Sequence, residues 1–177
     1  FINKDTELIS AYQILHNNCN KDNPYEDYIH ILEEHNISRP REKLENMFIL
    51  DYLILNEDRH LNNFGIIRDV SSLKWLDIAP IFDNGESLKI AYFDDEELYI
   101  KGDGRFFYET KTFDEIIKVV KNFDRIDINK LDGIVEWFDE LLHKYQKITE
   151  YSDTRINRLC ILLNRQVNKL KKLIENS

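Results

Sequence analysis

The stretch NEDRHLNNFG, from Asn56 to Gly65, decides how the rest of this sequence is interpreted. It follows directly on MFILDYLIL, Met47 to Leu55, which is the most apolar run in the chain. Connecting segments are commonly polar because they lie at the surface, but few gather two acids, an arginine, a histidine and three asparagines. So much ionisable chemistry at the exit of a buried segment indicates a turn with a function.

Length and composition predict one globular domain that spans residues 1–177. Hydrophobic residues make up 42% of the chain and charged residues 32%, and the net charge is -9. An acidic surface of this kind does not favour direct contact with nucleic acid or with an anionic membrane. No signal peptide or spanning apolar segment is apparent. Cys19 and Cys160 lie far apart in helical patterns, which is typical of free thiols in a reducing cytoplasm.

Three helices are predicted ahead of the polar stretch. The first begins at Asp5 or Thr6, where apolar residues recur at helical spacing. The second begins at Pro24 with Asn23 as its N-cap. The third begins near Pro40 and becomes apolar on almost every face, so we expect its end to be enclosed by protein.

The middle of the chain is predicted to form two β-hairpins, and the last third is helical again. Phe64–Ile67 and Leu73–Ile78 flank a short polar connection. A second hairpin is predicted from Glu97–Ile100 to Arg105–Glu109, with Lys101–Gly104 as its turn. Apolar periodicity then predicts helices over residues 112–120, 131–145 and 156–174. The expected fold class is therefore mainly α (α+β), helical with small hairpins.

Three oxygen-bearing side chains are expected to converge beside the first hairpin. Asp58 and Asn63 lie in the polar stretch, and Asp83 follows the second strand within APIFDNG. Two carboxylates and an amide oxygen suit Mg²⁺, which prefers oxygen ligands and keeps positions open for phosphate. Asp58 and Asn63 have the D-x-x-x-x-N spacing of a protein-kinase catalytic loop, and Asp83-Asn84-Gly85 stands where D-F-G would be.

On these residues the sequence resembles the larger, C-terminal lobe of the HipA-like kinases. These are bacterial serine/threonine kinases, and many are toxins of toxin–antitoxin pairs. The resemblance rests on N-E-D-R-H-L-N-N-F-G followed by A-P-I-F-D-N-G-E-S, from Asn56 to Ser87. The D-R-H-x-x-N form also resembles lipid kinases of the phosphoinositide 3-/4-kinase type.

The resemblance implies a role for each matching residue. Asp58 would be the catalytic acid that accepts the proton of the substrate hydroxyl, and Asn63 and Asp83 would hold Mg²⁺ against the phosphates of ATP. Arg59 would either contact phosphate or brace the loop. Ile81 would lie with Phe82 near the adenine. The implied nucleotide-binding set is His60, Leu61, Asn62, Asn63, Phe82 and Asp83.

The parts of a kinase that clamp ATP are not visible in this sequence. A complete kinase also has a glycine-rich loop, a strand lysine and a helix glutamate. The sole G-x-G, Gly102 to Gly104, is interpreted here as a hairpin turn. We therefore expect the smaller lobe to precede Phe1, and we expect residues 1–177 alone to bind ATP weakly and to transfer phosphate negligibly.

Two other functions remain open on the sequence alone. One is a kinase-like binding module that recognises a protein partner, such as an antitoxin or a regulatory protein. The other is a lipid-kinase-like phosphotransferase, which the acidic surface makes less favourable. The leading hypothesis is a kinase lobe that acts on a protein substrate. The Lys169, Lys171 and Lys172 cluster is interpreted as the solvated end of a helix.

Overall fold

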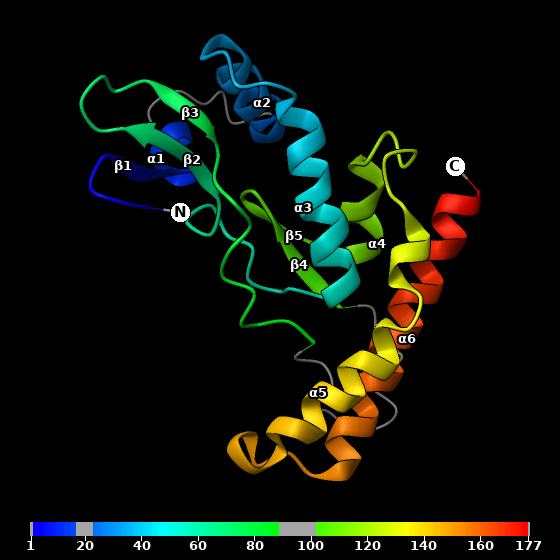
Figure 1. Ribbon diagram of the computed structural model, residues 1–177. Coiled ribbons are helices and arrows are strands. Elements are labelled where there is room, and N and C mark those ends of the chain that lie inside the picture. The colour runs from blue at the N-terminus through cyan, green and yellow to red at the C-terminus, as the bar shows by residue number, and fades with distance from the viewer. Residues whose placement is uncertain (1, 17–22, 89–101, 177) are drawn as a thin grey trace.

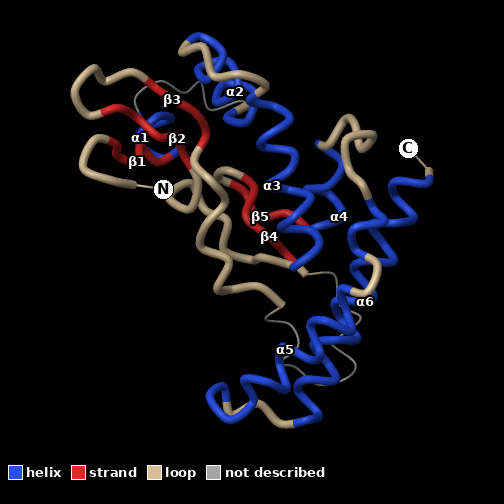
Figure 2. Tube along the Cα trace, in the orientation of Figure 1, coloured by secondary structure: helices blue, strands red, loops and turns tan. Residues whose placement is uncertain are grey.

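The structure is a computed structural model that describes residues 2–16, 23–88 and 102–176. The chain is mostly helical with two small antiparallel sheets, which confirms the predicted α+β class, and the sheet of β1, β2 and β3 lies at one edge of the molecule (Figure 1). Figure 2 shows the two sheets as separate groups of strands, with the long helices of the last third at one end of the molecule. No helix within the described residues is long and apolar enough to cross a membrane.

The first sheet contains three strands in the order β1-β2-β3. They are β1 (Thr6–Ser10), β2 (Gly65–Asp69) and β3 (Trp75–Ile78). Both pairs are antiparallel, so the predicted hairpin between β2 and β3 is confirmed. The edge strand β1 was not predicted.

The predicted helix from Asp5 or Thr6 is wrong over its first half. Residues of β1 pair with β2, for example Ile9 with Ile66, and only α1 (Ala11–His16) is helical. The strand ends where the Ala11 N–H donates to the Phe64 carbonyl at 2.9 Å. Pairing with a strand more than fifty residues away in the sequence outweighs the local helical periodicity, because it satisfies the backbone of both strands.

The helices α2 (Pro24–Glu34) and α3 (Pro40–Ile54) begin where the sequence predicts. Asn23 caps α2 by accepting a hydrogen bond from the Glu26 N–H, and a proline occupies the first turn of each helix. The core lies between these helices and the two sheets. Almost fully buried residues of this core include Tyr28, Leu32, Leu44, Phe48 and Ile66.

The second sheet pairs β4 (Asp103–Phe106) with β5 (Glu109–Thr112), so the predicted hairpin turn at Lys101–Gly104 is wrong. The chain reverses instead at Phe107 and Tyr108, with Phe107 in the left-handed region at φ 53°. Gly104 lies inside β4, where an added Cβ would stand 2.8 Å from the Phe113 ring. Its small size serves close packing. The predicted strand over residues 97–100 lies outside the described residues.

The last third confirms the predicted helices with adjusted bounds. Thr112 and Glu115 form the expected capping box at α4 (Phe113–Ile116), which continues as the 3₁₀ helix η3 (Ile117–Val119). After η4 (Ile128–Leu131), α5 (Ile134–Thr149) and α6 (Asp153–Glu175) form a hairpin (Figure 1). The α6 helix packs onto its own domain, and buried Gln166 donates to the Tyr52 carbonyl at 2.8 Å.

Candidate active site

The polar stretch begins where α3 ends in a left-handed residue. Leu55 adopts φ 50°, and both its N–H and the N–H of Asn56 are directed to the Asp51 carbonyl. Asn56 is only 1% exposed. Its amide nitrogen donates to the Asp51 carboxylate at 3.1 Å, and its oxygen accepts from the Asp58 N–H at 3.3 Å. The turn is therefore attached to the last turn of α3 by a buried amide.

Arg59 is the buried centre of the site, with 1% of its surface exposed. Its guanidinium forms a two-pronged ion pair with Asp51, in which Nε and Nη2 each lie 2.9 Å from a carboxylate oxygen. It also donates to the Asn63 carbonyl at 2.9 Å, to the Phe82 carbonyl, and to the Asn84 side-chain oxygen. These contacts are those of a brace between two turns.

Burial raises the pKa of Asp51, and hydrogen bonds from Arg59 and Asn56 oppose that rise. Burying an isolated charge costs free energy. Here that cost is offset because the Arg59 guanidinium uses all its N–H donors in hydrogen bonds, two of them to the Asp51 carboxylate. Asp51 belongs to the apolar run and Arg59 to the polar stretch. The pair therefore explains why an acid stands within MFILDYLIL.

Asn63 is held against the residue predicted as the catalytic acid. Its side-chain nitrogen donates to the Asp58 carbonyl at 2.8 Å, and the side chain is buried. Because the nitrogen is used in this way, the amide oxygen is the atom available to a ligand. The hydrogen bond to the Asp58 carbonyl thus fixes the orientation of the Asn63 amide.

The Asp58 carboxylate is partly open and lies between two basic side chains. It is 36% exposed; Arg105 Nε lies 3.4 Å from one oxygen, and His60 Nε2 lies 3.7 Å from the other. Arg105 comes from β4, whose residues alternate between exposed and buried, so it reaches the turn from a different part of the fold. The Asp58 carboxylate is therefore partly open to solvent, with the Arg105 guanidinium as a positive charge beside it.

The turn that carries Asp83 lies beside the first turn. Asp83 is exposed and adopts φ 55°, and its carbonyl accepts from the Asn56 side chain at 3.5 Å. Downstream, the Leu88 N–H donates to the Ile54 carbonyl at 2.8 Å, which attaches the following residues to the end of α3. The backbone contacts therefore bring the turn of Asp58 and Asn63 beside the turn of Asp83, and the convergence of their three side chains on one ion stays a prediction.

Other residues of the predicted nucleotide-binding set have structural partners. Leu61 is buried, and its carbonyl accepts from the Tyr12 N–H at 3.0 Å. Asn62 accepts from the Ser10 hydroxyl at 3.1 Å, and its N–H donates to His60 Nδ1 at 3.2 Å. These contacts connect the turn to β1 and α1. His60 is half-buried, and its Nε2 remains directed to Asp58.

The donor set fits Mg²⁺ better than a metal held entirely by protein. No group of three His, Cys, Asp or Glu side chains within the described ranges could hold a metal ion. Mg²⁺ is commonly bound through one or two carboxylates while phosphate oxygens and water complete its shell. One amide oxygen, from Asn63, and one exposed carboxylate, from Asp83, match that pattern.

Three contributors to this geometry were missed from the sequence. Asp51 and Asn56 hold Arg59 and the turn, and Arg105 faces Asp58. An acid in the middle of an apolar run was a visible signal for Asp51, since buried acids need a partner. No local signal marked Arg105, because its approach depends on how β4 packs against the turn.

The chain is similar in structure to a Helicobacter pylori proinflammatory kinase, CtkA. It matches that crystal structure with a TM-score of 0.64 and 18% sequence identity, over 99% of this chain and 74% of the CtkA chain. At this identity the likeness shows the fold, which is therefore kinase-like. No family model matches the chain, and no curated protein sequence matches it.

Proposed function

We propose that this chain is the larger, catalytic lobe of a Mg-ATP-dependent serine/threonine protein kinase of the HipA-like type. The junction of the two turns carries the proposal. Buried Arg59 bonds to the backbone of Asn63 and Phe82 at once, so an Asp-x-x-x-x-Asn turn and an Asp-Asn-Gly turn meet in a kinase-like fold. If the two turns served only to end a helix and a strand, a buried arginine that bonds to both of them would not be required.

In this proposal Asp58 accepts the proton from a serine or threonine hydroxyl. As the hydroxyl oxygen forms its bond to the γ-phosphorus of ATP, the bond to the ADP oxygen breaks and the proton passes to the Asp58 carboxylate. Positioning of this kind and charge stabilisation are the main contributions of protein to phosphoryl transfer. The partial exposure of Asp58 leaves room for the acceptor, and Arg105 and His60 face the negative charge that gathers there.

Asn63 and Asp83 are the proposed ligands of Mg²⁺, which would neutralise charge on the phosphates. The Asp58 carbonyl fixes the Asn63 amide, so its oxygen is already oriented before any ligand arrives. Asp83 takes a left-handed backbone conformation that is uncommon for a residue with a side chain. Strain of this sort is found at functional turns, and the neighbouring Arg59 contacts maintain it here.

We also propose that the missing part of the ATP site belongs to a smaller lobe. Ile81 is 39% exposed and precedes the half-buried Phe82, so an apolar surface is available beside the proposed metal ligands. This surface would contact only one face of an adenine ring, and the smaller lobe would contact the other face. Isothermal titration of this chain with Mg-ATP should therefore show weak binding, and Asp83→Ala should weaken it further.

The decisive test is phosphate transfer by the natural full-length protein and its variants. Asp58→Ala should lower the transfer of radiolabelled phosphate from ATP to serine or threonine by about a hundredfold or more, which is the range for loss of a general base. Asp83→Ala should do the same through loss of the metal. Both should unfold like the parent in urea.

A matched control is Asp124→Ala, which removes an exposed aspartate in the loop after η3. It should leave transfer unchanged. If the Asp58 and Asp83 variants also transfer phosphate at the parent rate, these roles are wrong. If a lipid accepts phosphate while serine and threonine do not, the lipid-kinase alternative replaces the protein-kinase proposal.

A further inference from the structure

A groove lined by α3, α4, η3 and α6 shares no residue with the two turns of the candidate site. We call it the α4–α6 groove; it measures about 440 Å³. Its lining combines apolar and basic side chains from α3, α4, η3 and α6. The residues are Tyr52, Asp114, Ile117, Lys118, Lys169, Lys172, Leu173 and Asn176.

The floor of the α4–α6 groove is apolar and its rim is basic. Tyr52 and Ile117 are buried, and Leu173 is half-buried against the core. Lys118 and Lys172 are exposed at the rim. Burial raises the pKa of Tyr52 to about 12, so its ring contributes a neutral surface to the floor at physiological pH.

The rim lysines differ in their partners. The pKa of the Glu115 carboxyl is lowered by the hydrogen bonds of its capping box and, to a lesser degree, by the nearby Lys118 charge. Lys169 lies 3.6 Å from Asp114, but neither the Lys118 nor the Lys172 ammonium forms a hydrogen bond or an ion pair with another residue of the described ranges. Three lysines from two elements therefore gather positive charge at one groove, in a chain whose net charge is -9.

The dipole of α6 accounts for only part of this arrangement. Cations are favourable in the last turn of a helix, and Lys172 occupies that turn of α6. Lys118 belongs to η3, a separate short element more than fifty residues earlier, yet it lines the same groove. Because basic side chains from two elements converge on one groove, the geometry points to a ligand there as well as to the favourable placement of cations at the end of α6.

We propose that the α4–α6 groove docks an acidic peptide segment of a partner protein, with an apolar side chain on the floor and carboxylates against Lys118 and Lys172. An apolar floor suits a leucine or an aromatic side chain, and carboxylates complement the rim. A phosphate backbone offers no apolar side chain for the floor, so a peptide fits this lining better than a nucleic acid. The proposal does not depend on the kinase function.

The test is fluorescence anisotropy with a labelled peptide of alternating glutamates around one leucine and one phenylalanine. The probe should bind this chain, and binding should weaken as salt increases. A second peptide of the same charge, with alanine in place of the leucine and phenylalanine, should bind at least several-fold more weakly. Equal binding of the two peptides would overturn the proposal, because it would leave the apolar floor without a role.

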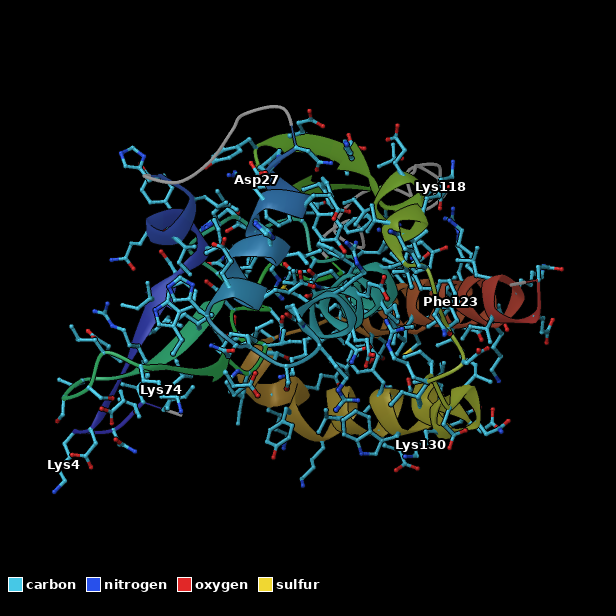
Figure 3. The ribbon with its side chains drawn as sticks, turned by 90° about the horizontal axis from the view of Figure 1, so that it is seen from above. Lys4, Asp27, Lys74, Lys118, Phe123 and Lys130 are labelled. Carbon is cyan, nitrogen blue, oxygen red and sulfur yellow. The ribbon has the colours of Figure 1, made fainter. Side chains whose placement is uncertain are left out.

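The variant is the double charge reversal Lys118→Glu with Lys172→Glu, which should weaken the leucine-containing probe about tenfold or more. Lys130→Glu with Lys147→Glu is the matched control. Lys130, like Lys118, lies in the last turn of a 3₁₀ helix, and Lys147, like Lys172, occupies the last turn of an α-helix. Figure 3 shows Lys118 and Lys130 on either side of α6.

Both double variants carry the same net charge, so long-range electrostatics alone would affect them equally. The control should retain binding within about twofold, and both proteins should keep the circular dichroism of the parent. Equal loss in the two variants would overturn the proposal, as would absence of binding to the parent. Stronger binding of a single-stranded oligonucleotide than of the peptide would also overturn it. If the parent forms dimers that the groove variant abolishes, a second copy of the chain occupies the groove instead.

Discussion

The turn after α3 and the helix α5 differ in where they keep their polar and apolar side chains. In the turn, Arg59 and Asn56 are each 1% exposed and are bonded to Asp51. In α5, by contrast, no residue is buried. Even the apolar side chain of Ile148 has 79% of its surface exposed.

The difference shows that the two regions are stabilised by different kinds of contact. In the turn, each buried donor has a specific acceptor, so the positions of Asp58 and Asn63 follow from directional bonds. The α5 helix is held mainly by one amphipathic side against α6, and such contacts tolerate small shifts. Substitutions should therefore have large effects in the first region and small ones in the second.

The largest loss of stability is expected from Arg59→Met. It removes the partner of a carboxylate that is almost completely buried and breaks the bonds to Asn63 and Phe82. Loss of one member of a buried pair costs about 3–5 kcal/mol. Urea unfolding followed by circular dichroism measures the change.

A double variant separates the cost of the orphaned charge from that of the lost brace. Asp51→Leu combined with Arg59→Met leaves no buried charge, so part of the stability should return. The carbonyls of Asn63 and Phe82 would still lack their donor. A loss below about 1 kcal/mol for Arg59→Met alone would mean that the buried network is not what stabilises this region.

A smaller loss is expected from Gly65→Ala, at the end of the same polar stretch. An added Cβ would stand 2.1 Å from the Ile9 carbonyl oxygen, so β1 and β2 would have to move apart. Overpacking of this kind costs about 1–3 kcal/mol. Gly85→Ala is the control, because nothing lies within 4 Å of its Cβ position and its effect on the free energy of unfolding should be much smaller. Equal losses would contradict the close approach of the strands.

Local signals in the sequence predicted the elements whose ends are set by neighbouring residues. Asn23 and Pro24 marked the start of α2, and Thr112 with Glu115 marked the capping box of α4. The spacing of Asp58 and Asn63 with Asp83 also predicted that two turns would meet, and the backbone contacts agree. Each of these signals is either contained within a few consecutive residues or matches a known motif, so it can be recognised without knowledge of the fold.

The features that were missed depend on pairing between distant segments. The β1 strand exists because β2 offers it a partner, and the same residues read alone have helical spacing. Arg105 reaches Asp58 only after β4 has packed against the turn. The hairpin turn was placed at Lys101–Gly104 because glycines favour turns, whereas Gly104 is small to admit the Phe113 ring.

The smallest effect is expected from Ile148→Ser on α5. The side chain is 79% exposed, and isoleucine and serine have similar helix propensities, so the free energy of unfolding should change by no more than about 0.5 kcal/mol. Ile156→Ser is the matched control in the same helical hairpin, because Ile156 is 0% exposed. That change should cost about 3 kcal/mol or more, since it leaves a cavity and buries a hydroxyl. If Ile148→Ser also destabilised the protein by kilocalories, the exposed side of α5 would be covered in solution, and α5 would resemble the turn rather than contrast with it.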